Sequence, residues 1–241
     1  MNEAIQTINE FYKIEMSTKE FKRLSSFIQQ EVGIKLPEVK KTMLQSRLQK
    51  RLRVLQIPSF KDYINYVFED GNKEELVHMF DVVSTNKSDF FREPVHFKHL
   101  QEEVFPRILR NKSNQHIKIW SAGCASGEEP YTLAMVAYDY MEDNPGFDFS
   151  ITGTDISSHA LQRGKNAVYK EQKVEHIPIE TKRKYMLKSK DRQHPTVKMN
   201  EKLRQKVSFK RLNFMENYYD MKEQFDIIFC RNTLIYFERD N

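Results

Sequence analysis

The sequence of 241 residues has only two cysteines, Cys124 and Cys230, and no apolar run that approaches the ~20 residues of a membrane span. Two cysteines cannot form a disulfide framework and do not by themselves make a metal site, so we expect reduced thiols and a cytoplasmic location. The N-terminus has acidic residues where a secretory signal would have a basic start and an apolar core, and we expect no such signal. With 39% hydrophobic and 30% charged residues, the composition predicts a globular protein with a sizeable core.

Several catalytic patterns are absent as well. The sequence has no Cys-x-x-Cys motif, no pair of histidines four residues apart and no Ser-His-Asp order, and its seven histidines are scattered. These absences disfavour a hydrolase and favour group transfer with an organic cofactor and no metal. The net charge of +5 permits nucleic acid, an acidic protein surface or anionic lipid as a partner and does not choose among them.

The stretch His116–Tyr131, HIKIWSAGCASGEEPY, organises the chain. Its alternating apolar residues predict a buried strand, the small residues from Gly123 to Gly127 predict a tight turn, and the letters EEP that follow are typical of a helix start. A strand, a glycine turn and a helix form the first unit of a nucleotide-binding α/β domain, where glycine lets the backbone approach a ligand.

The kind of ligand follows from what this turn lacks. No Lys follows Gly127, which excludes a phosphate loop, and the Gly-x-x-x-Gly spacing differs from the dinucleotide pattern. Glu128 and Glu129 would repel a pyrophosphate at the helix start, but they suit a cationic ligand that carries hydroxyl groups, such as S-adenosylmethionine. Alternatively, the two carboxylates only complement the helix dipole. We expect Glu129 to contact the cofactor and Glu128 to be a helix-start charge.

Residues 1–83 are predicted to form a helical N-terminal domain, in which Ser17 and Glu20 make a capping-box pattern. Within this domain the segment 38–55 is a predicted helix with six basic residues and one acid. Most basic helices simply present a solvated face, but this imbalance also favours a docking surface for an acidic partner.

Residues 84–93 interrupt the helical pattern, either as a plain linker or as a segment that contributes to the active site, and residues 94–241 are a predicted α/β domain. The predicted strand at 147–154 ends at Asp155, an acid that can accept hydrogen bonds from ribose hydroxyls or simply cap a helix. Extended runs at about 196–206 predict a small antiparallel β insert. A doubly wound domain would continue past the last predicted strand, so we expect the C-terminal strands to be truncated.

One glycine and five polar or charged residues follow the ends of the predicted strands or lie at the glycine turn. They are Gly123, Glu129, Asp155, Asn213, Arg231 and Asn232. Because the carboxyl ends of parallel strands meet at one edge of a sheet, we expect these residues to converge on one ligand crevice.

Five runs of the sequence resemble the CheR-type chemotaxis receptor methyltransferases. They are RLQKRLR at 47–53, STNKSDFFRE at 84–93, WSAGCASGEEPY at 120–131, TDI at 154–156 and FCRNTLIYF at 229–237. The resemblance implies an all-α N-terminal domain followed by a Rossmann-like, S-adenosylmethionine-dependent methyltransferase domain. It also implies a protein-glutamate O-methyltransferase that modifies the cytoplasmic helical bundle of transmembrane chemoreceptors and releases S-adenosylhomocysteine.

The resemblance further implies roles for individual residues. Arg92 and Tyr236 would lie nearest the transferring methyl group, and Asp155 would hold the ribose. The cofactor would contact Asn86, Ser88, Arg92, Gly123, Glu129, Asp155, Asn213, Phe214, Arg231 and Asn232. The basic helix would dock acidic receptor segments through Arg47, Lys50, Arg51 and Arg53. In some members of the family the β insert binds a receptor tail peptide.

Two alternatives remain open from the sequence. One is a sensor module that binds S-adenosylmethionine without transferring its methyl group, which the intact Arg92 and Tyr236 disfavour. The other is an RNA methyltransferase, which the basic composition allows. The sequence has Arg231-Asn232-Thr233-Leu234 where an amino-group methyltransferase would have an Asn/Asp-Pro-Pro-Tyr/Phe run, and this difference argues against that alternative.

Overall fold

The computed structural model describes residues 13–69, 72–112 and 114–237, and the chain divides into two compact units. The first unit holds the chain as far as Thr85, together with Asn213–Asn217 and the residues from Leu234 onward. The second unit holds Asn86–Leu212 and Tyr218–Thr233.

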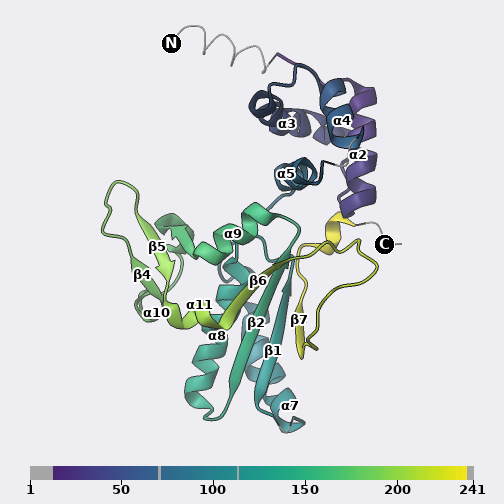
Figure 1. The fold of residues 1–241 in the computed structure, drawn as a ribbon. Helices are drawn as coiled ribbons and strands as arrows, with labels where there is room; N and C mark the ends of the chain where they lie inside the picture. Colours follow the sequence, from purple (N-terminus) through teal and green to yellow (C-terminus); the bar gives the residue numbers. More distant parts are fainter. Residues whose placement is uncertain (1–12, 70–71, 113, 238–241) are drawn as a thin grey trace. The chain divides into compact units, whose positions relative to one another are not determined.

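The first unit is helical (Figure 1). Its elements are α2 (Thr18–Val32), η1 (Glu38–Lys40), α3 (Lys41–Leu55), α4 (Phe60–Glu69), α5 (Lys73–Val83) and η4 (Leu234–Tyr236). Helix α2 begins at the predicted capping box: the Glu20 N–H donates to the Ser17 hydroxyl (3.2 Å), and the Ser17 N–H donates to the Glu20 carboxylate (2.7 Å). It ends at Gly33, whose positive φ of 73° is a left-handed helix cap.

The second unit contains a parallel sheet of four strands in the order β6-β2-β1-β7. The strands are β1 (His116–Ala122), β2 (Asp148–Asp155), β6 (Val207–Arg211) and β7 (Ile227–Phe229). Buried side chains alternate with half-buried ones along β1, and the buried Ile117 and Ile119 belong to the hydrophobic core. The predicted Rossmann-like arrangement is confirmed.

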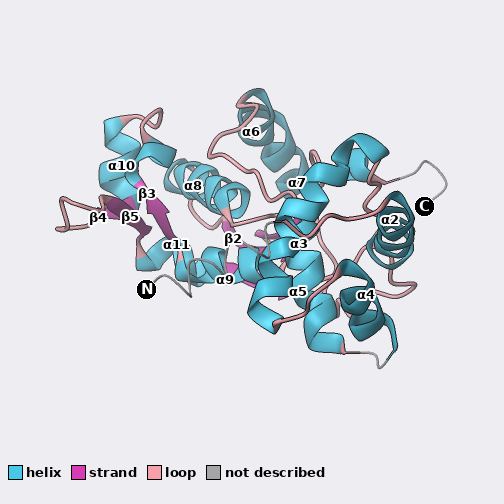
Figure 2. Ribbon diagram, turned by 90° about the horizontal axis from the view of Figure 1, so that it is seen from above, coloured by secondary structure: helices cyan, strands magenta, loops and turns pink. Residues whose placement is uncertain are grey.

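Helices connect and cover these strands (Figure 2). They are α6 (Val95–His99), the π-helical η2 (Leu100–Val104), α7 (Phe105–Arg110), α8 (Glu128–Asp143), α9 (Ser158–Asn166) and α11 (Glu201–Lys206). Helix α8 leads from β1 to β2 and packs on β2, and α9 contacts both β2 and β6. The core between sheet and helices includes Ile119, Tyr131 and Phe149, each at most 1% exposed.

A small antiparallel sheet, in the order β3-β5-β4, is inserted between α9 and β6. Its strands are β3 (Val168–Lys170), β4 (Met186–Lys188) and β5 (Thr196–Met199); η3 (Glu171–Val174) and α10 (Ile179–Tyr185) lie between β3 and β4. This corrects the expectation of an extended insert at 196–206, because Glu201–Lys206 is helix α11. The Asn200 side chain accepts from the Leu203 N–H (3.0 Å), and this N-cap starts a helix where the residue pattern suggested a strand.

In the described part of the chain, no helix combines the length and the apolar character that crossing a bilayer would need.

Candidate functional site

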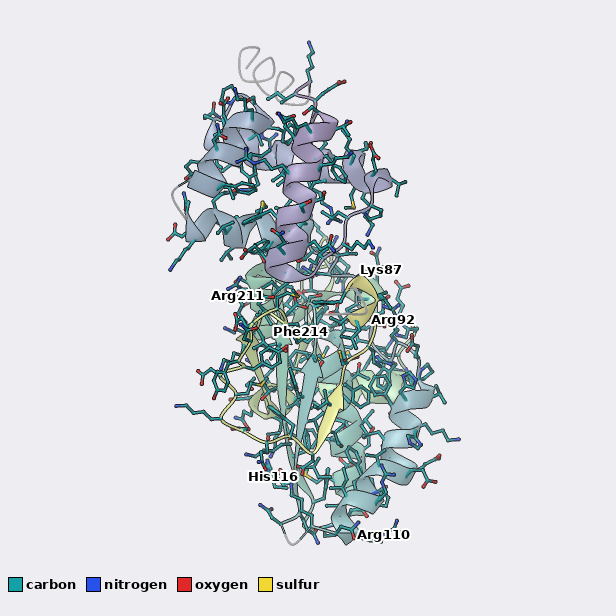
Figure 3. The ribbon with its side chains drawn as sticks, turned by 90° about the vertical axis from the view of Figure 1, so that its right-hand side faces the viewer. Lys87, Arg92, Arg110, His116, Arg211 and Phe214 are labelled. Carbon is teal, nitrogen blue, oxygen red and sulfur yellow. The ribbon has the colours of Figure 1, made fainter. Side chains whose placement is uncertain are left out.

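The register of the parallel sheet brings the carboxyl ends of several strands together. Ala122 lies opposite Thr154 and Ser121 opposite Phe229, so the turns that follow β1, β2 and β7 emerge at the same edge. Within the second unit, Lys87, Arg92 and Arg211 lie at this end, whereas Arg110 and His116 lie at the opposite end (Figure 3). Ligands of open parallel sheets bind at the carboxyl ends of the strands.

The turn after β1 depends on its two glycines. Gly123 has φ 78°, and its N–H and that of Cys124 both donate to the Thr154 carbonyl at 2.8 Å. Gly127 has φ 93° and caps α8. A Cβ on Gly123 would lie 2.1 Å from the Thr233 hydroxyl, and one on Gly127 would lie 2.9 Å from the Tyr169 hydroxyl. A side chain at either position would therefore be crowded and strained, by Thr233 at Gly123 and by Tyr169 at Gly127.

Asp155 fixes this turn from the end of β2. Its carboxylate is buried and accepts from the Ala125 N–H and the Ser157 N–H, both at 2.9 Å. The cap of helix α9 is Ser157, whose hydroxyl accepts from the Ala160 N–H. Asp155 therefore holds the turns after β1 and β2 together, while the N-cap of α9 is Ser157.

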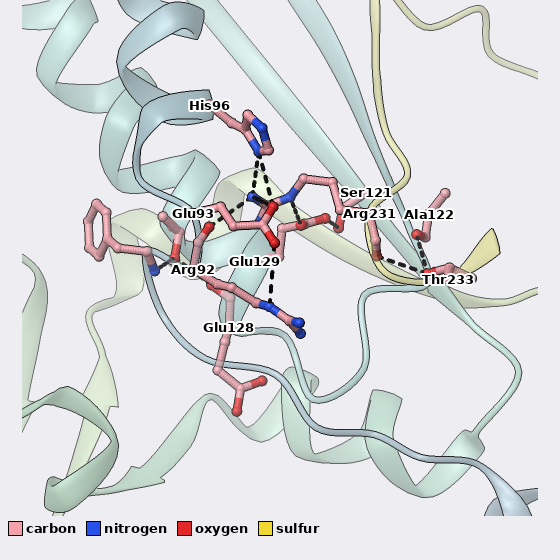
Figure 4. A network of polar contacts seen from close by, with 11 residues as sticks. Arg92, Glu93, His96, Ser121, Ala122, Glu128, Glu129, Arg231 and Thr233 are labelled. Atoms are coloured by element: carbon pink, nitrogen blue, oxygen red, sulfur yellow. Dashed lines mark hydrogen bonds and ion pairs between the residues drawn. The ribbon is translucent and has the colours of Figure 1, made fainter. Parts of the chain in front are cut away.

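Glu129 is the acid at the centre of the site. Its carboxylate accepts from the Ser121 hydroxyl at 2.7 Å and from Arg231 Nε at 2.9 Å (Figure 4). Burial raises the pKa of Glu129, although Ser121 and Arg231 oppose this shift by stabilising the charged form. The chain thus holds a carboxylate in a position where a cationic ligand would favour its ionised form.

Arg231 uses its guanidinium in several internal contacts. Besides Glu129, it donates to the Arg92 carbonyl (2.8 Å) and to His96 Nδ1 (2.9 Å), and it lies 3.5 Å from Glu93. It also lies over the rings of Phe97 and Phe229, at 5.0 and 5.7 Å. This environment makes Arg231 a fixed cation that orients Glu129.

Arg92 is exposed, and its Nε lies 3.9 Å from a Glu93 oxygen. The residues on either side, Phe91 and Glu93, both have positive φ values, 52° and 55°. Ala125 and Asn232 have positive φ as well, so four of the six such non-glycine residues in the described chain lie in the segments that carry the site. Backbone strain of this kind concentrates at functional sites, where the surrounding structure holds it in place.

The remaining predicted site residues are placed as follows. Asn86 and Ser88 are half-buried in the second unit. Asn213 and Phe214 belong to the first unit, where the Asn213 amide donates to the Glu31 carbonyl (2.6 Å) and the Phe214 ring lies 6.2 Å from that of Phe237. Tyr236 ends η4, and its side chain lies outside the described residues.

Among the predicted docking residues, Arg47 and Arg51 make side-chain contacts inside the helical unit. Arg47 Nη1 donates to the carbonyls of Val82, Val83 and Ser84 at 3.0 to 3.1 Å, where α5 ends. Arg51 binds the buried carboxylate of Glu75 through Nε (3.0 Å) and Nη2. Lys50 is exposed on the same helix, and Arg53 is partly exposed. Arg47 and Arg51 therefore stabilise the helical unit, whatever else they contact.

Neither thiol is activated as a nucleophile. Burial raises the pKa of Cys124 well above its usual value, and burial together with Glu129 raises the pKa of Cys230. Over the residues that the structure describes, no group of three or more His, Cys, Asp or Glu side chains could hold a metal ion.

The glycine turn, the carboxylates of Asp155 and Glu129 and the parallel sheet define an α/β domain that suits a nucleoside cofactor with a positive charge. Comparison with known families agrees. The model of "CheR methyltransferase, SAM binding domain" matches residues 86–241, and that of "CheR methyltransferase, all-alpha domain" matches residues 19–84. The chain belongs to the CheR methyltransferase family.

Three curated relatives carry the name "Chemotaxis protein methyltransferase". The protein of Borreliella burgdorferi is 38% identical over 93% of this chain and 80% of its own length. Those of Vibrio anguillarum and Escherichia coli are 33% and 30% identical, each over 94% of this chain, and the matches cover 82% and 77% of their lengths.

Sequence reasoning missed the side chains that support the site. Ser121, His96 and Lys173 contact site residues; Ser121 lies within the run 120–131 but was given no role, and no local motif marks His96 or Lys173. His96 lies 135 positions from Arg231, and Lys173 lies 84 positions from Asp89, so only the fold brings these partners together.

Proposed function

We propose that this protein transfers a methyl group from S-adenosylmethionine to glutamate side chains in the cytoplasmic helical bundle of chemoreceptors, forming methyl esters and S-adenosylhomocysteine. Family membership and the names of the relatives support methylation of chemoreceptors. The observation that carries the proposal is the half-buried Glu129, which Ser121 and Arg231 hold beside a turn with no room for a Cβ at Gly123. A sensor without transfer and an RNA methyltransferase are not favoured.

The donor groups of the site fit this cofactor. The carboxylates of Glu129 and Asp155 can bind an ammonium group and ribose hydroxyls, and Gly123 lets the backbone approach them. The other residues that we assign to cofactor binding are Asn86, Ser88, Arg92, Asn213, Phe214, Arg231 and Asn232. When bound, S-adenosylmethionine supplies an electrophilic methyl group on a sulfonium, and no metal is needed.

The acceptor needs no strong base. A glutamate side chain has an unperturbed pKa of about 4.3, so it is already an ionised nucleophile at neutral pH. The protein therefore contributes orientation and exclusion of water. Arg92 is exposed on a strained segment, where its guanidinium can hold the acceptor carboxylate in line with the methyl group. We assign Tyr236 to the same reaction centre.

The proposed contact with the receptor depends on charge. Basic residues of α3, with Lys50 exposed, would meet the acidic receptor segments in the cytoplasm. The β insert is a second candidate contact for a receptor peptide. The proposal includes neither nucleic acid as a substrate nor insertion into the membrane.

The test is transfer of tritiated methyl from S-adenosylmethionine to membranes that contain chemoreceptors. A carboxyl methyl ester is labile to base, so the label should be released as methanol at high pH. A base-stable label, or label that enters RNA in preference to receptor, would contradict the proposal. Binding of the cofactor without any transfer would identify a sensor.

Arg92→Ala should lower kcat roughly 10- to 100-fold, because the acceptor loses its positioning group. The fold should survive, since the Arg92 side chain is 42% exposed. Lys98→Ala is the matched control: this lysine is exposed on α6 in an i,i+4 pair with Glu102. Full activity of Arg92→Ala would remove Arg92 from the reaction.

A further inference from the structure

Glu128 is a fully buried carboxylate that the cofactor chemistry does not use. Its Oε2 accepts from the Ser126 hydroxyl at 2.8 Å, whereas its Oε1 is buried and has no hydrogen-bond partner among the described residues. The ammonium of Lys173 lies 3.5 Å from Oε1. A buried charge is costly unless it is paired, so Lys173 provides the compensation that Glu128 requires.

The same ammonium holds the segment that carries Arg92. Lys173 Nζ lies 2.8 Å from the Asp89 carboxylate, and it donates to the Ser88 carbonyl. The hydrogen bond from Lys173 lowers the pKa of Asp89. The ammonium thus donates hydrogen bonds to two oxygens of the 86–93 segment and forms an ion pair with Glu128. Lys173 therefore joins the 86–93 segment to the first turn of α8.

Tyr169 and His176, on either side of Lys173 in the sequence, also contact the 86–93 segment. The Tyr169 hydroxyl donates to the Ser126 carbonyl at 2.8 Å, and its ring meets that of Phe90 edge to face at 5.0 Å. His176 Nε2 lies 2.9 Å from the Phe90 carbonyl. The segment 169–176, which runs from β3 through η3, thus contacts both the glycine turn and the 86–93 segment. We call it the brace.

We infer that Lys173 is a positioning residue for methyl transfer, acting through Ser88, Asp89 and Glu128 to fix the 86–93 segment against the start of α8. The inference rests on the proposed function for its kinetic consequence. Arg92 follows Asp89 by three residues in a strained backbone, and Glu129 follows Glu128 directly. Loss of the link would let these two groups move relative to each other, whereas Lys173 itself is not assigned a contact with substrate or cofactor.

The first experiment compares Lys173→Met, Lys173→Arg and Lys170→Met in purified full-length protein. Lys170 is the control, because it is an exposed lysine of the same segment whose side chain makes no hydrogen bond or ion pair with the residues that the structure describes. We expect Lys173→Met to lower kcat about 10-fold or more, with the KM for receptor changing less than threefold. Lys173→Arg should restore most of kcat, because it keeps the charge beside Glu128. Lys170→Met should behave like the unaltered protein.

Hydrogen exchange at the amides of residues 86–93, measured without any acceptor, gives a readout that does not depend on activity. Lys173→Met should speed this exchange, and Lys170→Met should not. If the unaltered protein transfers no methyl to receptors, the proposed function fails while the exchange result still decides whether the brace exists.

Asp89→Ala covers the case in which Lys173→Met does not fold, because it removes the acceptor for Lys173 and leaves the Glu128–Lys173 pair intact. It should speed exchange in 86–93 and lower kcat about twofold, which is the share of an about tenfold loss that one of three equal contacts carries on a free-energy scale. Unchanged exchange and unchanged kcat in the folded variants would overturn the inference. An equal fall in kcat for Lys170→Met would overturn it as well.

Discussion

Glu128 and Glu129 are adjacent and chemically identical, but their surroundings give them different roles. Glu128 is sealed in the interior with Lys173 as its cation, whereas Glu129 is oriented by Ser121 and Arg231 at the strand ends. The sequence supported the choice of Glu129 for the cofactor. We predicted Glu128 to be a helix-start charge. The burial of Glu128 could not be foreseen, because the compensating Lys173 lies 45 residues further along the chain.

The raised pKa of Glu129 predicts how cofactor binding depends on pH. A carboxyl whose pKa is raised by burial becomes protonated at a higher pH than an ordinary glutamate, whose value is near 4.5. Binding of a cationic cofactor requires the carboxylate, so affinity should be constant at high pH and fall as the pH drops through the raised pKa. Calorimetric titration with S-adenosylhomocysteine, which keeps the ammonium group, would measure this fall.

Glu129→Gln is the control for this pH dependence. The variant should bind the ligand more weakly at neutral pH and show no inflection from this residue. The stability of the fold depends on pH in the opposite direction from cofactor affinity. The raised pKa of Glu129 stabilises the fold at low pH, and this contribution is lost as the pH rises through that pKa. An affinity that stays constant down to the pKa of an ordinary glutamate would exclude Glu129 as the binding carboxylate.

Helix α3 shows how one basic helix can serve two purposes. Arg51 pairs with Glu75, which is 2% exposed and also accepts from the Tyr63 hydroxyl at 2.9 Å. This network raises the pKa of Tyr63, through burial first and then through the charge of Glu75. The charge of Arg51 therefore serves the interior of the helical unit, and Lys50 carries the exposed charge.

Arg51→Ala should destabilise the protein by about 3 kcal/mol, because it leaves the buried Glu75 carboxylate without its cation. Lys50→Ala, one position earlier on the exposed face, should change stability by less than about 0.5 kcal/mol. Urea unfolding followed by circular dichroism would measure both. Similar stability of the two variants would show that Glu75 finds compensation elsewhere.

Local patterns predicted the elements whose signals are local. The capping box at Ser17 and Glu20 and the strand, glycine turn and helix at 116–131 could all be identified from neighbouring residues. The insert could not be outlined in the same way. Its strands β3, β4 and β5 are three or four residues long, and pairing between distant segments defines them, since Tyr169 lies opposite Val197. Short strands carry too few residues for their alternation to be distinguished.

The chain as a whole carries a net charge of +5, and part of it lies on α3. Arg47 and Arg51 are unsuitable for testing a docking role, because their replacement also breaks contacts within the helical unit. Lys50 is suitable, since it is exposed and its side chain makes no hydrogen bond or ion pair within the described part of the chain. Lys61, exposed on α4, offers a control with the same change of charge.

Lys50→Glu should lower kcat/KM for receptor methylation about two- to fivefold at low ionic strength, because rim charges chiefly steer association. The difference from the unaltered protein should shrink near 0.5 M salt, where the screening length falls to roughly 4 Å. Affinity for S-adenosylhomocysteine should not change, since Lys50 is not among the residues that we assign to cofactor binding. If Lys61→Glu lowers kcat/KM equally, the effect reflects net charge and α3 is not the docking surface. If Lys50→Glu has no effect at low salt, the exposed charge of α3 does not steer the receptor.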